Sequence, residues 1–178
     1  PLEAECLKPV LETLCWPIIT DVLSQLSGAS LSHRMVGVET LIKTGQFEDV
    51  SLEAVVHVGG RLVSTHLLKW IKRQPSCTYV QCLTQSQPFD PELCVTRSVQ
   101  WPISLSMKVL TQLPALDAQW TRQLTTLSHL FHTTINDIYT SPTCLSEPYL
   151  AMSLSRLFRK NSAVFLSNSM PIRMMDLY

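Results

Sequence analysis

The residue types best suited to binding chemistry lie near the end of the chain, in Ser167-Asn168-Ser169 and Arg173. The apolar run at 162–166 predicts a buried strand, so these residues would lie where a strand ends and a helix begins. In open α/β sheets ligands bind beyond the carboxyl ends of the strands, where hydroxyls, an amide and free N–H groups hold a carboxylate or phosphate. Arg173, about one turn later, could add a bidentate contact. The alternative is an ordinary helix N-terminus with an exposed arginine.

A second candidate has the same strand-to-helix geometry. Gly59-Gly60-Arg61 follows an apolar run and precedes Ser64, a good helix N-cap. The spacing is not that of a G-x-G-x-x-G phosphate loop, and a lone Gly-Gly pair is weak support for a nucleotide site. A tight turn is the simpler interpretation.

Histidine and cysteine patterns give no support for a metal or thiol centre. His129 and His132 are three residues apart, but helical periodicity puts His129 opposite the apolar stripe and His132 on its flank, so both should face solvent. The six cysteines form no C-x-x-C pair and no repeated ligand spacing. We therefore expect free thiols, a reducing compartment and no metal site.

Composition excludes several classes of function. The chain has 178 residues, 46% of them hydrophobic, with 14 basic and 14 acidic residues, which fits one domain with a substantial core. Zero net charge gives no electrostatic basis for binding nucleic acid or an anionic membrane, and no apolar run approaches the ~20 residues of a membrane span. The 5 glycines are too few to suggest a phosphate-cradling loop. The ends, PLEAEC and RMMDLY, suggest a fragment of a longer protein.

The pattern of elements predicts the fold class. Runs at 54–58 and 78–83 are strand-like and enclose a helix that begins after Ser64, a βαβ unit that requires parallel pairing. An edge strand is expected at 95–99. Further elements are expected as follows: a helix over 7–14, a strand at 17–20, helices bracketed by Pro102, Pro114 and Asp117, a long helix with an apolar stripe from Trp120 to Ile138, and a helix after Ser146 with Leu150, Leu154, Leu157 and Phe158 on its face. The prediction is an α/β fold with an open, mostly parallel, Rossmann-like sheet covered by helices on both faces.

Four segments follow one another in an order found in a known enzyme family. They are Trp16-Pro17 with Asp21 and Leu23-Ser24; Val58-Gly59-Gly60-Arg61 with Ser64, Leu67-Leu68 and Trp70; Asp90-Pro91 with Val95-Thr96-Arg97; and Leu145 to Tyr149 followed by Ser162 to Arg173 and Asp176. In this order they resemble the MenD family, the 2-succinyl-5-enolpyruvyl-6-hydroxy-3-cyclohexene-1-carboxylate synthases. The amino-acid sequence of these segments is most similar to the synthase module of multifunctional plant and algal proteins. The last segment is the most specific.

The resemblance implies an oligomeric enzyme of three α/β domains that uses thiamine diphosphate and Mg²⁺. Such enzymes join decarboxylated 2-oxoglutarate to isochorismate in phylloquinone and menaquinone biosynthesis. Residues 1–140 would be the central domain, and residues 141–178 a linker helix, strand and turn opening the diphosphate-binding domain. The family's contacts to substrate carboxylates fall on Asn168, Ser169 and Arg173. The implied catalytic residues, cofactor and metal ligands lie in other domains, so the fragment alone should not catalyse. A plastid location is implied if the parent is plant-like, otherwise the cytoplasm.

Four residues depart from the family's pattern. Ser167 replaces a glycine, Thr65 and His66 replace a basic pair, and Met174 replaces an aspartate. These changes motivate a second hypothesis, a catalytically inactive relic that serves as an interaction or assembly module. A generic Rossmann-like nucleotide binder is a third, motivated by the Gly-Gly pair.

Overall fold

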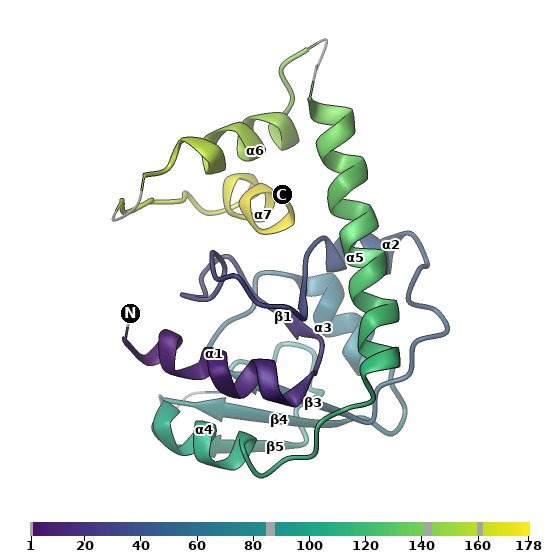
Figure 1. The fold of residues 1–178 in the computed structure, drawn as a ribbon, viewed down its shortest axis with the longest axis vertical. Coiled ribbons are helices and arrows are strands. Elements are labelled where there is room, and N and C mark those ends of the chain that lie inside the picture. Colours follow the sequence, from purple (N-terminus) through teal and green to yellow (C-terminus); the bar gives the residue numbers. More distant parts are fainter. Residues whose placement is uncertain (1, 85–87, 141–143, 160–161) are drawn as a thin grey trace.

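The computed structural model describes residues 2–84, 88–140, 144–159 and 162–178. Within these ranges seven helices and five short strands are mixed along the chain, and the last four elements, α4 to α7, are all helices (Figure 1). The elements are α1 Leu2–Leu14, β1 Ile18–Ile19, β2 Arg34–Met35, α2 Val38–Lys43, β3 Ala54–Val58, α3 Thr65–Lys72, β4 Thr78–Leu83, β5 Arg97–Gln100, α4 Ile103–Leu110, α5 Ala118–Tyr139, α6 Glu147–Leu157 and α7 Met170–Leu177.

The main sheet is three-stranded and parallel, in the order β3-β4-β5. Strands β3 and β4 have the predicted bounds, and α3 joins them, so the expected βαβ unit is confirmed. The expected edge strand begins two residues later than predicted: Thr96 donates its N–H to the Tyr79 carbonyl (2.9 Å), and regular pairing starts at Arg97. A separate parallel pair, β1 with β2, is two residues long on each side. The predicted α/β class with a parallel sheet is therefore confirmed.

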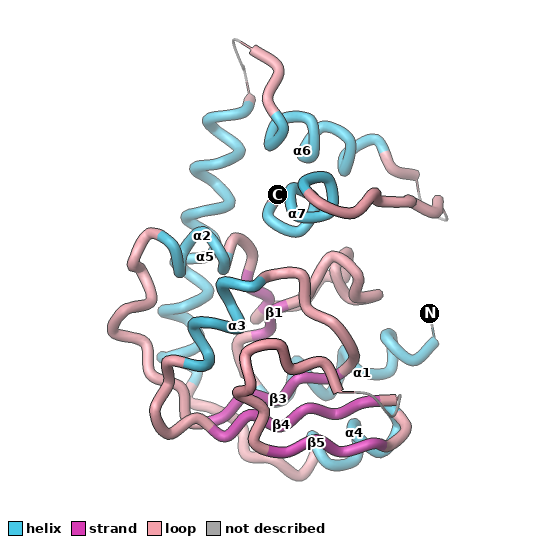
Figure 2. Tube along the Cα trace, turned by 180° about the vertical axis from the view of Figure 1, so that it is seen from behind, coloured by secondary structure: helices cyan, strands magenta, loops and turns pink. Residues whose placement is uncertain are grey.

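The two faces of the sheet pack into different cores because side chains alternate along β3. Val56 packs with Leu7 and Leu14 of α1 and Leu110 of α4, whereas Val55 packs on the opposite face. Helices α1 and α4 lie on the side nearer the viewer in Figure 1, and the reverse view of Figure 2 leaves the strands in front. The larger core lies on the far face and contains residues of α2, α3, β4 and α5: Val38, Leu41, Leu67, Leu68, Trp70, Ile71, Tyr79 and Leu124, together with Met35 and Phe47.

The long helix α5 begins at the predicted cap, where the Asp117 carboxylate accepts a hydrogen bond from the Gln119 N–H (2.8 Å). Its stripe packs on the larger core, but Ile138 at its far end is 58% exposed. Gly37, before α2, has φ +66°, and Phe131 of α5 lies where a Cβ would be. The glycine thus permits α5 to approach α2 closely.

The first helix also ends as predicted. Leu14 is its last residue, Cys15 has a φ of +53°, and Trp16 donates its indole N–H to the Pro114 carbonyl (3.1 Å). The turn before Pro17 thereby directs the chain into β1.

The prediction of a buried strand over 162–166 is wrong. Residues 162–167 have no regular structure, and Phe165 is 96% exposed. Among the described residues none lies beside this segment as a strand, and a strand is stable only when its N–H and C=O groups find partners. β-branched and aromatic composition alone therefore does not produce a strand here.

Helix α6 begins as predicted, with the Ser146 hydroxyl accepting a bond from the Tyr149 N–H (3.4 Å). The expected apolar face is present, but it does not face the core. Its four members Leu150, Leu154, Leu157 and Phe158 are 40–72% exposed, while Ala151 and Met152 are buried. The helix packs on α7 through its other side.

Gly37→Ala should destabilise the chain by about 2–4 kcal/mol, because the new methyl group would overlap Phe131 and the residue would keep a left-handed backbone. The Cβ would lie 2.0 Å from Phe131 Cε1. Gly60→Ala is the matched control, since a Cβ there meets no atom within 4 Å. Urea denaturation measures both variants. Equal, small effects would contradict the role given to Gly37.

Candidate functional site

The predicted site residues lie together at the start of α7. The Asn168 carboxamide oxygen accepts a hydrogen bond from the Ser169 N–H (2.9 Å), and Ser169, with φ +76°, is the residue preceding α7. Arg173 lies about one turn into the helix. All three side chains are exposed, and within the described ranges the Arg173 guanidinium has no hydrogen bond or ion pair to another residue. The expected placement at a helix N-terminus is confirmed; whether these residues bind a substrate remains a prediction.

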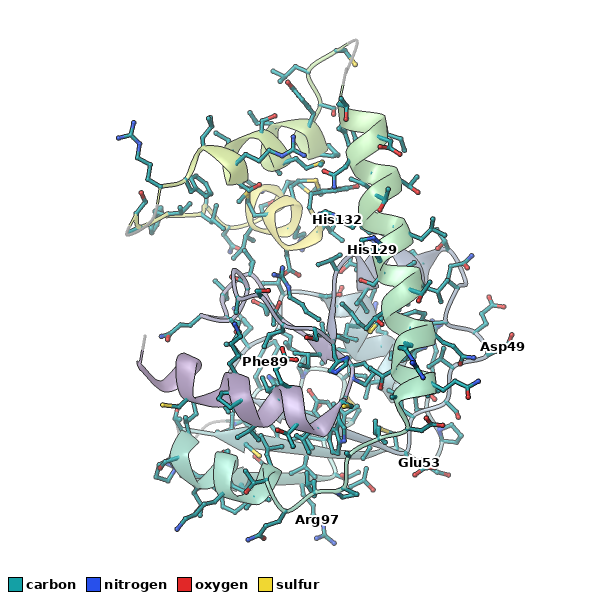
Figure 3. All side chains as sticks on the ribbon, viewed as in Figure 1. Asp49, Glu53, Phe89, Arg97, His129 and His132 are labelled. Atoms are coloured by element: carbon teal, nitrogen blue, oxygen red, sulfur yellow. The ribbon has the colours of Figure 1, made fainter. Side chains whose placement is uncertain are left out.

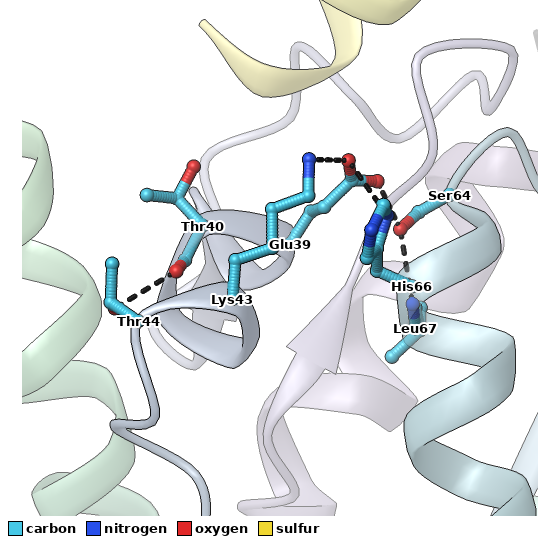
Figure 4. Close-up of polar contacts among 7 residues, drawn as sticks. All are labelled: Glu39, Thr40, Lys43, Thr44, Ser64, His66 and Leu67. Atoms are coloured by element: carbon cyan, nitrogen blue, oxygen red, sulfur yellow. Dashed lines mark hydrogen bonds and ion pairs between the residues drawn. The ribbon is translucent and has the colours of Figure 1, made fainter.

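The N-terminus of α3 is built around the Ser64 hydroxyl. It accepts a hydrogen bond from the Leu67 N–H (3.2 Å) and donates one to Glu39 Oε2 (2.5 Å), as Figure 4 shows. Glu39 belongs to α2, so one hydroxyl caps α3 and ties it to the neighbouring helix. The same carboxylate receives Lys43 Nζ at 2.6 Å and lies 3.3 Å from His66 Nδ1.

The contacts around Glu39 determine its charge state. Burial opposes ionisation, but the hydrogen bonds from Lys43 and Ser64 outweigh it and lower the pKa of the Glu39 carboxyl. The carboxylate is therefore ionised at neutral pH. His66, at one of the positions where the resemblance places a basic pair, lies beside this anion with an exposed ring.

The described residues up to 140 are called the central unit here. A cleft of about 820 Å³ separates this central unit from the C-terminal helices α6 and α7. Its walls come from the loop after β1, from α2 and α3, from the middle of α5 and from α7; they include Asp21, Glu39, Ser64, Phe131, Ile172 and Asp176. Asn168, Ser169 and Arg173 do not line it. The structure thus separates the exposed turn at the start of α7 from the opposite side of that helix, which faces the cleft.

The Gly59-Gly60 segment forms a turn. Gly59 has φ +117°, and its N–H donates to the Cys82 carbonyl (2.9 Å), which extends the β3–β4 pairing by one bond. Arg61 follows this turn, and its guanidinium carbon Cζ lies over the Phe89 ring, 4.8 Å from the ring centroid. These contacts fit the tight-turn interpretation, because the backbone and the guanidinium are both engaged within the chain.

The two histidines of α5 point away from any cluster of ligands. Both are exposed, and His132 is within hydrogen-bond distance of the Asn136 amide (3.1 Å) (Figure 3). In the part of the chain that the structure describes, no three His, Cys, Asp or Glu side chains are grouped to hold a metal ion. The six cysteines are free thiols, and none of the helices in the described ranges is long and apolar enough to cross a bilayer.

The described fold is a small parallel sheet flanked by helices, followed by a helix with polar residues at its start. The profile of the family described as "Middle domain of thiamine pyrophosphate" matches residues 3–166, and the chain belongs to this family. The family's place among thiamine pyrophosphate enzymes implies that cofactor in the parent protein.

Within that family the relatives point to one group. The chain is 25% identical to the 2-succinyl-5-enolpyruvyl-6-hydroxy-3-cyclohexene-1-carboxylate synthase of Chlorobium phaeobacteroides over 99% of its length. It is 28% identical to the same-named enzyme of Shewanella sediminis over 98%, and 26% identical to the chloroplastic protein PHYLLO of Arabidopsis thaliana over 93%. It spans 30% of each synthase and 10% of PHYLLO. The chain is thus a MenD-family central domain, as the resemblance indicated.

Sequence reasoning missed Glu39. No local pattern marks it, since it lies 25 residues before Ser64 and meets that hydroxyl only when α2 and α3 pack together. The signal that could have identified it is the i, i+4 pair with Lys43, which is common on exposed helices and therefore carries little information by itself.

Glu39→Gln should reduce stability by about 1 kcal/mol near neutral pH, because it removes the anion that Lys43 and Ser64 contact. A lowered pKa means that this stabilisation is complete above the ordinary value of 4.5 and is lost as the pH falls through the folded-state value. Urea denaturation of wild type and variant at about pH 7 and about pH 3.5 measures the difference. Glu53→Gln, at an exposed carboxylate, is the control. A difference that grows on acidification would contradict this account.

Proposed function

We propose that the chain is the central domain of a thiamine-diphosphate-dependent 2-succinyl-5-enolpyruvyl-6-hydroxy-3-cyclohexene-1-carboxylate synthase, acting in phylloquinone or menaquinone biosynthesis. The parent enzyme would join decarboxylated 2-oxoglutarate to isochorismate. The observation that carries the proposal is the match of nearly the whole chain to synthases bearing that name. A plant-like parent would act in the plastid, as the chloroplastic relative does.

The turn at the start of α7 would contribute to the wall of the active site. Both proposed substrates carry carboxylates, and Arg173 offers an exposed guanidinium without an internal partner among the described residues. Asn168 and Ser169 add an amide, a hydroxyl and backbone N–H groups at the positive end of a helix. A charge-assisted pair with Arg173 could orient a carboxylate bidentately.

Residues 141–178 would open the diphosphate-binding domain. Two apolar surfaces support this division, the exposed face of α6 and the irregular segment with Val164 and Phe165. Large exposed apolar side chains close together in the sequence are typical of a surface that another part of the protein covers. The proposed boundary lies between residues 140 and 141, next to residues 141–143, which are outside the described residues.

The cofactor would be held elsewhere in the parent. When bound in the parent, thiamine diphosphate would supply the electron sink for decarboxylation, and Mg²⁺ would help to hold the cofactor. In the described part of this chain the acidic side chains do not gather as a magnesium site, and the one Gly-Gly turn is engaged internally. Within a proposed homo-oligomer, the chain's own task would be to position and bind substrate rather than to perform the chemical step.

A catalytically inactive relic is the second candidate function, because Thr65 and His66 stand in place of a basic pair. Ser167 does not have a positive φ, so a side chain there requires no left-handed backbone.

Arg173→Ala in the full-length enzyme should raise KM for at least one of the two substrates about 10- to 100-fold, equivalent to about 1.4–2.7 kcal/mol of lost charged contact. Steady-state kinetics with 2-oxoglutarate and isochorismate measure it. Arg97→Ala is the control, since Arg97 is an exposed cation on the edge strand β5 (Figure 3). Unchanged kinetics for both substrates would remove Arg173 from the site.

Assays of the full-length protein also distinguish the synthase hypothesis from the hypothesis of a catalytically inactive relic. The synthase hypothesis expects turnover and a rise in Tm when thiamine diphosphate and Mg²⁺ are added. A protein that gives neither would support the assembly role.

A further inference from the structure

The C-terminal helix α7 is attached to the central unit through a partly buried carboxylate. Asp176, on the cleft side of α7, accepts a hydrogen bond from the Val22 N–H with an Oδ1···N distance of 2.6 Å. The two residues are 154 positions apart in the sequence. The bond satisfies a backbone donor in the loop after β1, and a donor left without a partner in such a place is destabilising.

A second carboxylate, that of Asp21 in the same loop, connects the loop to the segment before α3. Asp21 Oδ2 accepts from the Val63 N–H (2.6 Å), in the loop before α3, and Asp21 Oδ1 accepts from the Leu23 N–H (2.8 Å). Two successive residues of one loop therefore connect to different elements. Asp21 secures the loop to the start of α3, and Val22 secures α7 to the loop.

The charges that face Asp176 make this connection unusual. Asp21 approaches it from the loop after β1, and Glu39 from α2; both are acidic. Among the basic groups, Arg34 of β2 and His132 of α5 line the same cleft, whereas Lys43 of α2 and His66 of α3 contact Glu39. His57 of β3 interacts electrostatically with Asp21. Arg173 lies on α7 itself, on its exposed side.

We propose that Asp176 is a positioning residue: its bond to Val22 fixes α7, and with it Asn168, Ser169 and Arg173, against the central domain, and the charge of the carboxyl group sets how firmly α7 is held. The substrate part of this inference rests on the proposed function. The attachment of α7 to the central unit does not rest on that function, since it is inferred from the contact of Asp176 with Val22.

The direction of the pH effect follows from the surroundings. Burial, together with the Asp21 and Glu39 carboxylates, raises the pKa of Asp176 from 3.8 to about 6, although the Val22 N–H opposes this. A raised folded-state pKa means that docking is favoured by protonation and weakens as the pH rises through about 6. A protonated carboxyl group keeps a carbonyl oxygen for Val22 and loses the repulsion from Asp21 and Glu39. Acidification should therefore tighten the attachment of α7.

Hydrogen exchange of the full-length protein, followed by mass spectrometry, tests the attachment. Protection of peptides covering 20–24 and 170–178, corrected for the intrinsic rate, should fall about 3- to 10-fold from about pH 5.5 to about pH 8 in wild type. In Asp176→Asn the protection should stay at the high level at both pH values, because the neutral amide oxygen still accepts from Val22. Asp176→Ala should lower it at both pH values. Asp49→Asn, at an exposed loop carboxylate, should behave as wild type.

Kinetics of the same variants test the positioning. Asp176→Ala should raise KM for the substrate that Arg173 contacts more than it lowers kcat, and Asp176→Asn should restore KM and abolish its pH dependence near 6. Equal behaviour of the Asn and Ala variants in exchange, or protection that rises with pH in wild type, would overturn the inference. Normal exchange behaviour in an inactive enzyme would instead refute the proposed function and leave the attachment intact.

Discussion

The Ser64 hydroxyl holds together the elements on which the rest of the structure depends. A parallel β3–β4 pair needs a crossover helix, and α3 can start where it does because Ser64 satisfies the Leu67 N–H. The same hydroxyl bonds to Glu39, so the start of α3 also fixes the neighbouring α2. Since both helices contribute to the larger core, a single buried hydroxyl connects the sheet, its covering helices and the cleft wall.

The C-terminal helices are placed by a few polar and aromatic contacts rather than by a shared core. Asp176 bonds to Val22, Arg156 donates to the Asn136 carboxamide (2.7 Å), and Tyr178 lies edge-on to Tyr139. Between these contacts lies the cleft. An arrangement of this kind allows small adjustments of one unit against the other, because few apolar contacts must be broken. A turn attached in this way can be both held in place and adjustable.

Local sequence determined much of the fold and little of the site. The β-branched runs of β3 and β4, bounded by Gly59 and Pro75, were sufficient to predict both strands, and Asp117 and Ser146 were sufficient to predict two helix starts. Strand β2 and helix α2 escaped prediction because they are short and depend on tertiary contacts. Residues 162–166 have the composition of a strand but no strand beside them among the described residues. The grouping of Asn168, Ser169 and Arg173 was predictable from their spacing alone. The contact of Asp176 with Val22 was not, since nothing local relates residues 154 positions apart.

Helix α5 has a further consequence. Its 22 residues contain no glycine or proline and rise about 33 Å, from the core beneath Trp120 to Tyr139 beside the C-terminal helix. Because the helix is uninterrupted, its two ends keep a fixed rotation and distance relative to each other. One inserted residue would turn everything beyond it by about 100° and advance it by about 1.5 Å, which would take Phe131 away from Gly37 and Tyr139 away from Tyr178. Length changes among relatives of this domain should therefore accumulate in the loops on either side of α5 and leave its interior at constant length.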